Sequence, residues 1–463
     1  MNNVTIFINC VTLTVVKRTN FVHKSNCNKT PFMNNIYTKT GISATKTGLL
    51  IILSACFFAI GCVQKQSPMK IVSEDPMVKN FYASNDNQFW FSSNKNIKKA
   101  NEWLDAIESG NTFGLVADKV QIEQARIALS GKNKTDIVLK EKTDQQITGL
   151  VLNFMKELQE GSVHFDFDGV SIPRDSVYAA QLLDSNRGES VSDIIARIDC
   201  KDTDYVVYKT FLNDSLTPND TLRYKTVILA MNYRRYISIN GQSEYVIANI
   251  PATEVEYYRN DKPVLKMRSV AGKKKNPTPT IASYITDIVT FPFWNVPFSI
   301  ASKELLPKVQ NDETYLERNN FEVVDSKGNV VDDYDLNWAS YTEKTFPYFF
   351  RESTGPNNSL GVLKFNLKNP FSIFLHDTNS KGGFAKDSRF LSHGCIRLEK
   401  PVELAQLIAE DKIDISALKT GQKDTVSKII VLEKSVPVFI IYMPVKVDEG
   451  KVVFLNDVYG LIK

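Results

Sequence analysis

The sequence predicts an α+β protein in which a mostly helical N-terminal domain precedes a strand-rich C-terminal domain. Up to about residue 240, apolar residues recur every three or four positions, which is the period of an amphipathic helix. From Glu244 onward the period changes to two, which is typical of strands with one packed face. The chain of 463 residues is 43% apolar and 23% charged, so it has an ordinary folded composition and room for two domains.

Residues 1–61 are predicted to be a signal region, with Met33 as the true start. A basic stretch precedes an apolar run from Leu49 to Ile60, which is shorter than the roughly 20 residues of a membrane span. The run ends at Ala59-Ile60-Gly61-Cys62, which resembles a lipoprotein processing site. Cleavage there would leave Cys62 as the lipidated first residue of the mature chain.

Two alternatives to this processing site remain open. Leu53-Ser54-Ala55-Cys56 matches the four-residue pattern better, but it would leave a very short apolar region, so Cys62 is favoured. The other alternative is an uncleaved signal or a plain membrane anchor. With Cys62 as the anchor, we expect a protein of the cell envelope that faces the periplasm and is held to a membrane by lipid.

The helical part of the chain is expected to follow a polar tether at residues 62–75 and to extend over residues 76–240. Helical spacing of apolar residues predicts helices at 97–107, 120–129, 147–158 and 224–236. Thr143 and Gln146 suit a capping box at the start of the third helix, and Gly161 suits its end. Cys200 is expected to be an unreactive structural residue.

The strand-rich domain is predicted to cover residues 243–445, followed by a tail at 446–463. Alternating patterns predict two strands and then a third after a turn at Asn260-Asp261; the three are Tyr245–Ile250, Val255–Arg259 and Val264–Arg268. Pro401 suits the first position of a helix, and the apolar run Val438–Tyr442 predicts a central strand.

Charge and cysteine content exclude several classes of function. A net charge of +4, dispersed over the chain, gives no reason to expect nucleic acid as a partner. If cleavage falls before Cys62, only Cys200 and Cys395 remain as thiols, which excludes a disulfide scaffold. Cys395, His393 and His376 lack the further ligands that a zinc site needs, so neither a metal nor another cofactor is expected.

A cysteine with two nearby histidines, in a chain with four histidines in all, predicts an activated nucleophile. A free thiol has a pKa of about 8.5, and the attacking species is its thiolate, so a neighbouring imidazole would help. Either His376 or His393 could be the base. The other would then hold local geometry or help to form an oxyanion pocket beside the backbone amides of Gly394 and Cys395.

The ordered motifs around this cysteine resemble those of the L,D-transpeptidase (YkuD-type) catalytic domain. In that family a histidine, here His376, precedes a run such as Ser392-His393-Gly394-Cys395-Ile396-Arg397. The flanking stretches Phe293–Pro297 and Gly355–Gly361 resemble the large periplasmic murein L,D-transpeptidases, which carry an N-terminal scaffold domain. The resemblance runs from about Phe81 to the C-terminus, although the peptidoglycan-binding module of better-known relatives is missing here.

The resemblance implies roles for individual residues. Cys395 would be the nucleophile and His376 its general acid and base, with Asp377 orienting His376 through its backbone carbonyl. The residues implied to shape the pocket or its oxyanion site are Ser392, His393 and Gly394, and those implied to bind substrate are Trp294, Asn295 and Arg397. For Arg397 two roles stay open: it binds a substrate carboxylate, or it pairs with an acidic residue to hold the loop.

By the same resemblance, we expect a peptidoglycan L,D-transpeptidase that forms 3-3 cross-links from tetrapeptide stem donors through a cysteine acyl-enzyme. The expected partners are donor and acceptor stems and the membrane, with carbapenems as inhibitors. An insertion at about 302–345 would form a mobile cap that shields the acyl-enzyme from water. The alternatives are an L,D-carboxypeptidase or endopeptidase, and a non-enzymatic lipoprotein that binds the cell wall.

Overall fold

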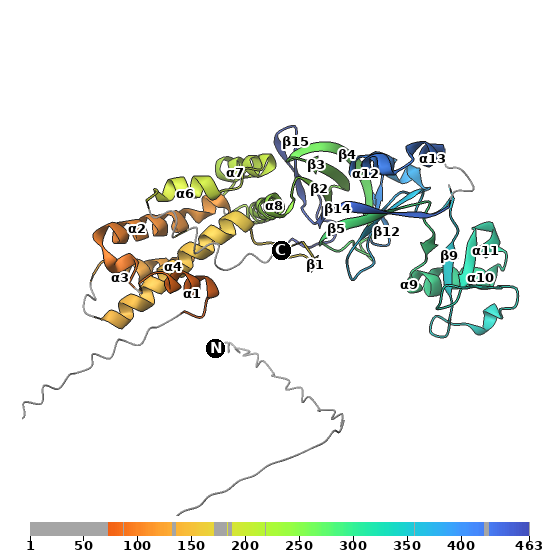
Figure 1. Cartoon of the computed structure of the whole chain (residues 1–463), viewed down its shortest axis with the longest axis horizontal. Coiled ribbons are helices and arrows are strands. Elements are labelled where there is room, and N and C mark those ends of the chain that lie inside the picture. The colour runs from red at the N-terminus through yellow and green to blue at the C-terminus, as the bar shows by residue number, and fades with distance from the viewer. Residues whose placement is uncertain are drawn as a thin grey trace, which may run out of the picture. The chain divides into compact units, whose positions relative to one another are not determined.

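The structure is a computed structural model, and it has the predicted α+β fold, with helices first and strands after them (Figure 1). The residues that it describes are 73–86, 88–131, 136–170, 183, 188–217, 219–355, 357–420 and 426–462. The predicted signal region, the lipidation site at Cys62 and most of the tether lie outside these residues.

Among its described residues, the helical part contains all four of the helices that apolar spacing predicts, and three further ones. The helices are α1 (Pro76–Ala83), α2 (Asn94–Glu108), α3 (Lys119–Leu129), α4 (Ile137–Glu160), α6 (Val191–Ile198), α7 (Thr203–Ser215) and α8 (Thr221–Asn240). A core that includes fully buried Trp103 and Leu104 joins α1 to α4 with α6. The sequence analysis did not predict α1, α6 or α7. For α6 and α7, the polar composition after residue 172 concealed their apolar stripes.

The predicted capping box of α4 is wrong. The helix begins at Ile137, where the Asp136 carboxylate accepts the backbone N–H of Leu139 at 3.0 Å, so Thr143 and Gln146 lie inside the helix. The polar residues of its middle turns are used in tertiary contacts instead: the Asp144 carboxylate accepts the backbone N–H of Trp90 at 2.7 Å. The predicted end at Gly161 is confirmed, with φ at 69°.

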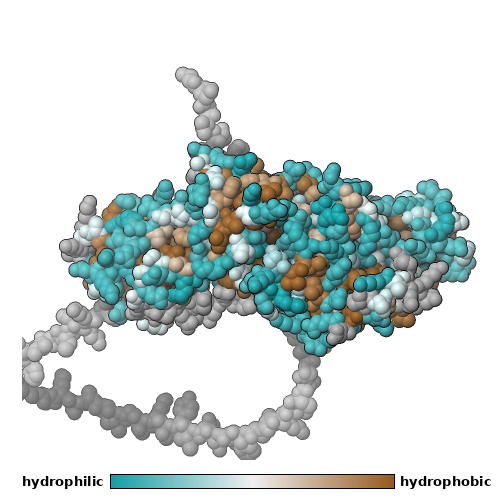
Figure 2. All heavy atoms as spheres, turned by 90° about the horizontal axis from the view of Figure 1, so that it is seen from above, coloured by the Kyte–Doolittle hydropathy of each residue, from teal (hydrophilic) through white to brown (hydrophobic). Residues whose placement is uncertain are grey.

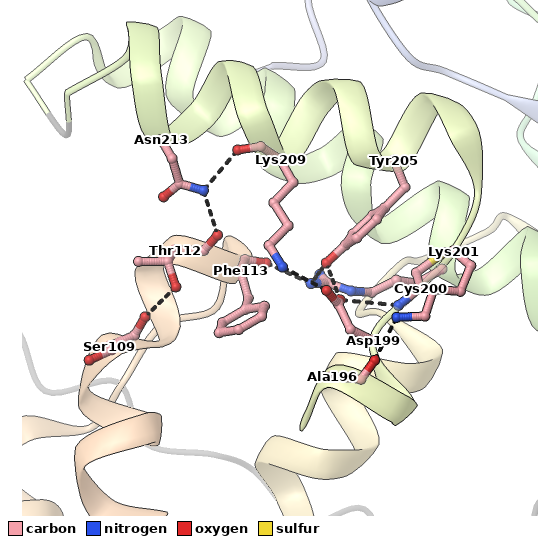
Figure 3. A network of polar contacts seen from close by, with 11 residues as sticks. Ser109, Thr112, Phe113, Ala196, Asp199, Cys200, Lys201, Tyr205, Lys209 and Asn213 are labelled. Carbon is pink, nitrogen blue, oxygen red and sulfur yellow. Dashed lines mark hydrogen bonds and ion pairs between the residues drawn. The ribbon is translucent and has the colours of Figure 1, made fainter. Parts of the chain in front are cut away.

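Polar contacts attach α7 to the segment after α2 (Figure 3). Asp199 accepts hydrogen bonds from the Tyr205 hydroxyl and from Lys209 Nζ, each at 2.6 Å. The Lys209 ammonium also lies 4.1 Å from the centre of the Phe113 ring. Cys200, next in the chain, is a buried free thiol, in agreement with the structural role expected of it.

The strand-rich part is built on one sheet that closes on itself. Its order is β1-β5-β10-β11-β13-β4-β3-β2-β14, and β14 also pairs with β5. The strands are β1 (Phe167–Asp168), β2 (Glu244–Asn249), β3 (Glu254–Arg259), β4 (Lys262–Gly272), β5 (Ile281–Thr290), β10 (Leu363–Leu367), β11 (Leu375–His376), β12 (Phe390–Ser392), β13 (Ile396–Leu398) and β14 (Lys428–Ile441). Asn260 and Asp261 have φ of 50° and 58°, which confirms the turn between β3 and β4.

Strand β5 is central to this sheet, and the sequence analysis missed it. It pairs with β1, β10 and β14. The predicted helix after Pro401 is α12 (Pro401–Ala409), and it is followed by α13 (Ile415–Thr420). A hairpin of β15 (Val445–Asp448) and β16 (Lys451–Phe454) precedes the end of the chain.

The helical part and the sheet share a core rather than meeting through a linker. Buried side chains of α7 and α8, among them Tyr208 and Ile237, pack in one cluster with Ile247 of β2 and Phe439 of β14. In addition, β1 lies between α4 and α6 in sequence and pairs with β5 of the sheet. The site strands therefore stand on a framework to which both parts contribute.

The predicted insertion forms a larger unit than expected, residues 294–352, which we call the cap subdomain. Its sheet has the order β6-β9-β7-β8, with strands β6 (Trp294–Asn295), β7 (Phe321–Val324), β8 (Val330–Val331) and β9 (Phe349–Glu352). Its helices are α9 (Phe298–Ile300), α10 (Leu306–Asn311) and α11 (Tyr315–Arg318), with a π-helical turn at Ala301–Leu305. A separate core, which includes Trp338 and Phe350, holds it together.

The face drawn in Figure 2 is hydrophilic over most of its area, with separate hydrophobic areas among the polar side chains. Within the described part of the chain, no helix combines the length and the apolar character needed to span a membrane.

Candidate active site

Three neighbouring strands place the candidate residues in one row. Lys364 of β10 lies opposite His376 of β11, and His376 lies opposite Arg397 of β13. Residues that are directly opposite in a sheet project from the same face, so the three side chains stand side by side, with the imidazole in the middle. Cys395 precedes Arg397 by two residues, at the end of the loop that enters β13.

A cavity of about 360 Å³ opens over this row. His376, Cys395 and Arg397 all line it, although 19 residues separate His376 from Cys395 in the sequence. Its other walls come from the segment Phe371–Phe374 and, on the cap subdomain, from Trp294 and the start of α9. The volume lies within the range of small-molecule binding sites.

The environment of His376 fixes its tautomer. Its Nδ1–H donates to the backbone carbonyl of Asp377, and because a carbonyl can only accept, Nε2 is the basic nitrogen. Burial, followed by the charges of Arg397 and Lys364, lowers the pKa of His376 to about 3. The imidazole is therefore neutral at physiological pH and able to take a proton at Nε2.

The carboxylate of Asp377 holds the backbone that presents this carbonyl. It accepts the backbone N–H of Val362 at 2.9 Å and pairs with Lys381. Gly361, at φ 61°, makes the approach possible, because a Cβ there would lie 2.2 Å from Asp377 Oδ2. The contact with His376 is the one that the family resemblance implied for Asp377.

Cys395 is half-buried, and its thiol donates a hydrogen bond to the carbonyl of Ser372 at 3.7 Å. Ser372 has φ of 56°, a conformation uncommon for residues other than glycine, and this backbone presents its carbonyl to the thiol. Burial raises the pKa of Cys395 to about 11, which the Phe374 backbone and the charges of Lys364 and Arg397 only partly offset. The resting pair is therefore a neutral thiol beside a neutral imidazole.

Two of the residues predicted to support an oxyanion site instead hydrogen-bond within the loop that carries Cys395. The Ser392 hydroxyl donates to the carbonyl of Cys395 at 2.6 Å and accepts the backbone N–H of Gly394 at 3.1 Å. The carbonyl of Gly394 accepts the Thr278 hydroxyl at 2.7 Å. Gly394 has φ of 127°, and a Cβ there would lie 3.1 Å from Ile373, so a side chain would strain the loop.

His393 also lines the cavity, but its imidazole bonds to the cap subdomain. Its side chain is partly exposed, and its Nε2 lies 2.8 Å from Glu304 Oε1 in the π-helical turn of the cap subdomain. Gly394, between His393 and Cys395, has φ of 127°, so the two side chains are not related by the regular alternation of a strand. His393 thus links the loop that carries Cys395, which we call the catalytic loop, to the cap subdomain.

The aromatic motif before the cap subdomain contributes one of its two predicted residues. Trp294 lines the cavity, whereas the neighbouring Asn295 is exposed and is not among the described lining residues. Alternation along β6 explains the difference, since adjacent residues of a strand face opposite sides.

Lys364 and Ser372 are the site residues that the sequence analysis missed. Neither lies in a motif, and the importance of Lys364 depends on the pairing register of β10 with β11. Among the described residues, no group of three or more histidine, cysteine, aspartate or glutamate side chains is placed to hold a metal ion.

Comparison with known proteins agrees with this geometry. Residues 243–431 match the family described as the L,D-transpeptidase catalytic domain, and residues 76–212 match the family described as the scaffold domain. The chain contains an L,D-transpeptidase catalytic domain. A curated protein of Haemophilus influenzae named "Putative L,D-transpeptidase" is 34% identical over 235 residues, which are 50% of this chain and 47% of that protein. The match thus spans about half the length of each.

Solved L,D-transpeptidases are similar at a lower level. The catalytic domain of the E. faecium enzyme, acylated by ertapenem, is 13% identical, covers 43% of this chain and 97% of its own, and has a TM-score of 0.23. L,D-transpeptidase 3 of Mycobacterium tuberculosis is 12% identical, covers 43% of this chain and 61% of its own, and has a TM-score of 0.21. Because these TM-scores are low, the assignment rests on the family matches and the curated relative.

Proposed function

We propose that this chain is a transferase that joins peptidoglycan stems by L,D-transpeptidation, with Cys395 as its nucleophile and His376 as its general acid and base. The observation that carries the proposal is the cavity that both side chains line, with Nε2 of His376 left basic by the Asp377 carbonyl. The donor is a tetrapeptide stem, and the product is a 3-3 cross-link.

Acylation begins with both groups neutral. As Sγ of Cys395 attacks the carbonyl carbon of the third stem residue, the thiol proton passes to Nε2 of His376. The tetrahedral intermediate collapses when the bond to the fourth residue breaks, and the same proton goes to the departing amine. Of the two amides suggested for the oxyanion, Gly394 donates to Ser392, so the backbone N–H of Cys395 is the remaining candidate.

Transfer reverses the roles. The amine of a neighbouring stem attacks the thioester, Nε2 of His376 takes a proton from it, and Cys395 leaves and is reprotonated. Water can replace the amine, which would make the enzyme an L,D-carboxypeptidase. The Trp294 and α9 walls belong to the cap subdomain, so this unit limits access of water to the thioester.

The first test is intact-protein mass spectrometry of the full chain incubated with meropenem, beside Cys395→Ala and Cys200→Ala variants. We expect one adduct in the wild type and in Cys200→Ala, and none in Cys395→Ala. Meropenem is chosen because opening of its lactam by a thiol gives a thioester like that of the donor. Absence of the adduct in a folded wild-type protein would refute the nucleophile and favour a wall-binding protein.

The second test separates transfer from hydrolysis. Tetrapeptide muropeptides are incubated with the enzyme, and the products are resolved by liquid chromatography and mass spectrometry. Cross-linked dimers are the expected product, whereas tripeptides alone would make the protein an L,D-carboxypeptidase.

We also propose that the protein is lipid-anchored in the cell envelope through Cys62, on the sequence pattern alone. Labelled palmitate should be incorporated into the wild type and into Cys56→Ala, and not into Cys62→Ala. Incorporation that follows Cys56 instead would move the processing site.

A further inference from the structure

The described lining of the active-site cavity carries a positive charge and no negative charge. Among the described residues that line it, Arg397 is the permanently charged one, and no aspartate or glutamate is present. The carboxylate of Asp377 lies nearby but is already bound by Val362 and Lys381. Glu304 is engaged with His393. An anion in the cavity would therefore meet a cation and no competing carboxylate.

Arg397 has a buried hydrogen-bond donor that no described group satisfies. Its Nε is buried without a hydrogen-bond partner, and no carboxylate in the described part of the chain pairs with it. This removes support from the alternative in which Arg397 only pairs with an acidic residue to hold the loop. Burial lowers the pKa of Arg397, which shows the cost of keeping this charge away from water.

Lys364 repeats this pattern on the other side of His376. Its Nζ lies 4.4 Å from the centre of the Phe374 ring, and within the described residues no acid pairs with it. Burial lowers its pKa as well. Unlike Arg397, Lys364 is not among the described residues that line the cavity, so it acts on a ligand there by charge and not by contact.

We propose that Arg397 binds the terminal carboxylate of the donor stem, and that Lys364 reinforces this selection through its charge. The inference rests on the proposed function, because it assigns a role to a residue of the same site. It assigns the residue that would distinguish a stem ending in a free carboxylate one residue after the broken bond from a longer or amidated stem.

The spacing of the site fits this assignment. Cys395 directly precedes β13 and Arg397 is the second residue of that strand, so their Cα atoms lie at most about 7 Å apart. In a tetrapeptide, the terminal carboxylate carbon lies about 4 Å from the carbonyl carbon that Cys395 attacks. The carboxylate is therefore within reach of the guanidinium, whose planar fork can bind both oxygens. A fifth residue would move the carboxylate away by about 3.8 Å.

The test measures binding without chemistry. The full chain carrying Cys395→Ala is titrated by calorimetry with two synthetic stems, a tetrapeptide with a free terminal carboxylate and the same peptide with a terminal amide. We expect the acid to bind at least about tenfold more tightly, which is typical of a charge-assisted hydrogen-bonded pair. Adding Arg397→Gln should reduce the preference to no more than the roughly two- to threefold that the charge of Lys364 supplies, and Arg397→Lys should restore part of the difference.

Lys364→Gln, in the same Cys395→Ala background, is the matched control. It removes one positive charge from the same row, at the same register from His376, and leaves the cavity lining intact. We expect the preference for the acid to fall by only about two- to threefold, since a charge without contact is screened.

Three results would overturn the inference: equal affinities while Arg397 is present, a preference in Arg397→Gln as large as the one with Arg397 in place, or no binding of either peptide. If Arg397→Gln fails to fold, the comparison of acid and amide in the Cys395→Ala protein decides alone. Because this protein cannot be acylated, the result is independent of the meropenem test. An adduct with equal affinities would leave the proposed function standing without this inference.

Discussion

The chain treats two arginines in opposite ways: Arg234 of the helical part is buried, and Arg397 of the catalytic domain is half-buried. Arg234 of α8 is 2% exposed, and its Nε and Nη2 donate to the two oxygens of Asp202 at 2.7 and 2.6 Å. Burial disfavours its charge, but Asp202 and Asp204 outweigh burial and raise its pKa well above the usual value. Arg397 has no such partner among the described residues, and burial lowers its pKa.

The contrast shows what each charge is for. A buried cation that serves the fold is neutralised by a carboxylate that folding brings to it, because an unpaired buried charge is costly. A cation that binds a substrate needs hydrogen-bond donors that no protein group occupies. The unpaired charge therefore lowers the stability of the folded chain until a ligand binds. The four predictions that follow test the two sides of this contrast.

The largest effect is expected at His376, the neutral group between the two unpaired cations. His376→Ala removes the base that takes the thiol proton, and general-base catalysis contributes roughly 10²- to 10⁴-fold. The rate of meropenem adduct formation, followed by intact-protein mass spectrometry, should fall by that factor. His164→Ala, at an exposed histidine of the helical part, is the control and should leave the rate unchanged. An equal loss in both variants would contradict the assignment.

The second prediction compares the two arginines directly. Arg234→Met leaves Asp202 buried and unpaired, and breaking a buried ion pair in this way typically costs about 3 to 5 kcal/mol. Arg397→Met leaves no described carboxylate unpaired, so its effect on stability should stay within about 1 kcal/mol. Urea unfolding followed by circular dichroism measures both.

A double variant makes this prediction sharper. Replacing Asp202 by asparagine together with Arg234→Met removes both charges and keeps a side-chain oxygen for the Tyr205 N–H at the start of α7, so it should recover part of the lost stability. If Arg397→Met were as destabilising as Arg234→Met, the unpaired arginine would be structural and the contrast would fail.

Much of the site could be predicted from residue types, whereas its electrostatics could not. Cys395, His376 and the turn at Asn260-Asp261 are visible in the sequence, because their chemistry or conformation requires those residue types. Lys364 is one lysine among many until the register of β10 places it opposite His376. The bond between His393 and Glu304 joins residues 89 positions apart, so no local sequence pattern predicts it.

The errors in the fold have the same origin. The start of α4 was misplaced because tertiary contacts, such as those of Asp144 with Trp90, stabilise polar residues that local patterns assign to a helix end. Strand β5 was missed because it is paired on both sides along much of its length, and buried central strands lack a clear polar alternation.

The third prediction concerns pH. With the pKa of Cys395 raised to about 11, its thiolate fraction should rise about tenfold per pH unit from pH 6 to pH 9 without a plateau. Peptide-resolved mass spectrometry of iodoacetamide labelling at Cys395 measures this. Because the pKa of His376 is lowered to about 3, the profile should show no inflection near pH 6.5.

The same pH profile should also show the effect of Lys364 on the pKa of Cys395. Lys364 favours the thiolate, so Lys364→Gln should raise the pKa of Cys395 further and slow labelling about two- to threefold at each pH. A plateau near neutral pH would show instead that the thiolate forms an ion pair with His376, and that the resting site is not neutral.

The smallest effect is expected where the cap subdomain meets the catalytic loop. Deleting residues 311–342 is a poor test of the predicted shielding role, because it removes the buried Leu316, Val323 and Trp338 and so destroys the core of the subdomain. Glu304→Gln is milder: it weakens the bond to His393, which is partly exposed and therefore contributes little to stability.

If the cap subdomain shields the thioester, loosening this contact should admit more water and lower the ratio of cross-linked dimer to hydrolysed tripeptide by about twofold. Glu343→Gln is the matched control, since Glu343 pairs with Lys303 at 3.2 Å, next to Glu304 in sequence but within the subdomain. A ratio that changes equally in both variants would point to general loosening of the subdomain. An unchanged ratio in Glu304→Gln would mean that the bond to His393 positions the catalytic loop and does not control access of water.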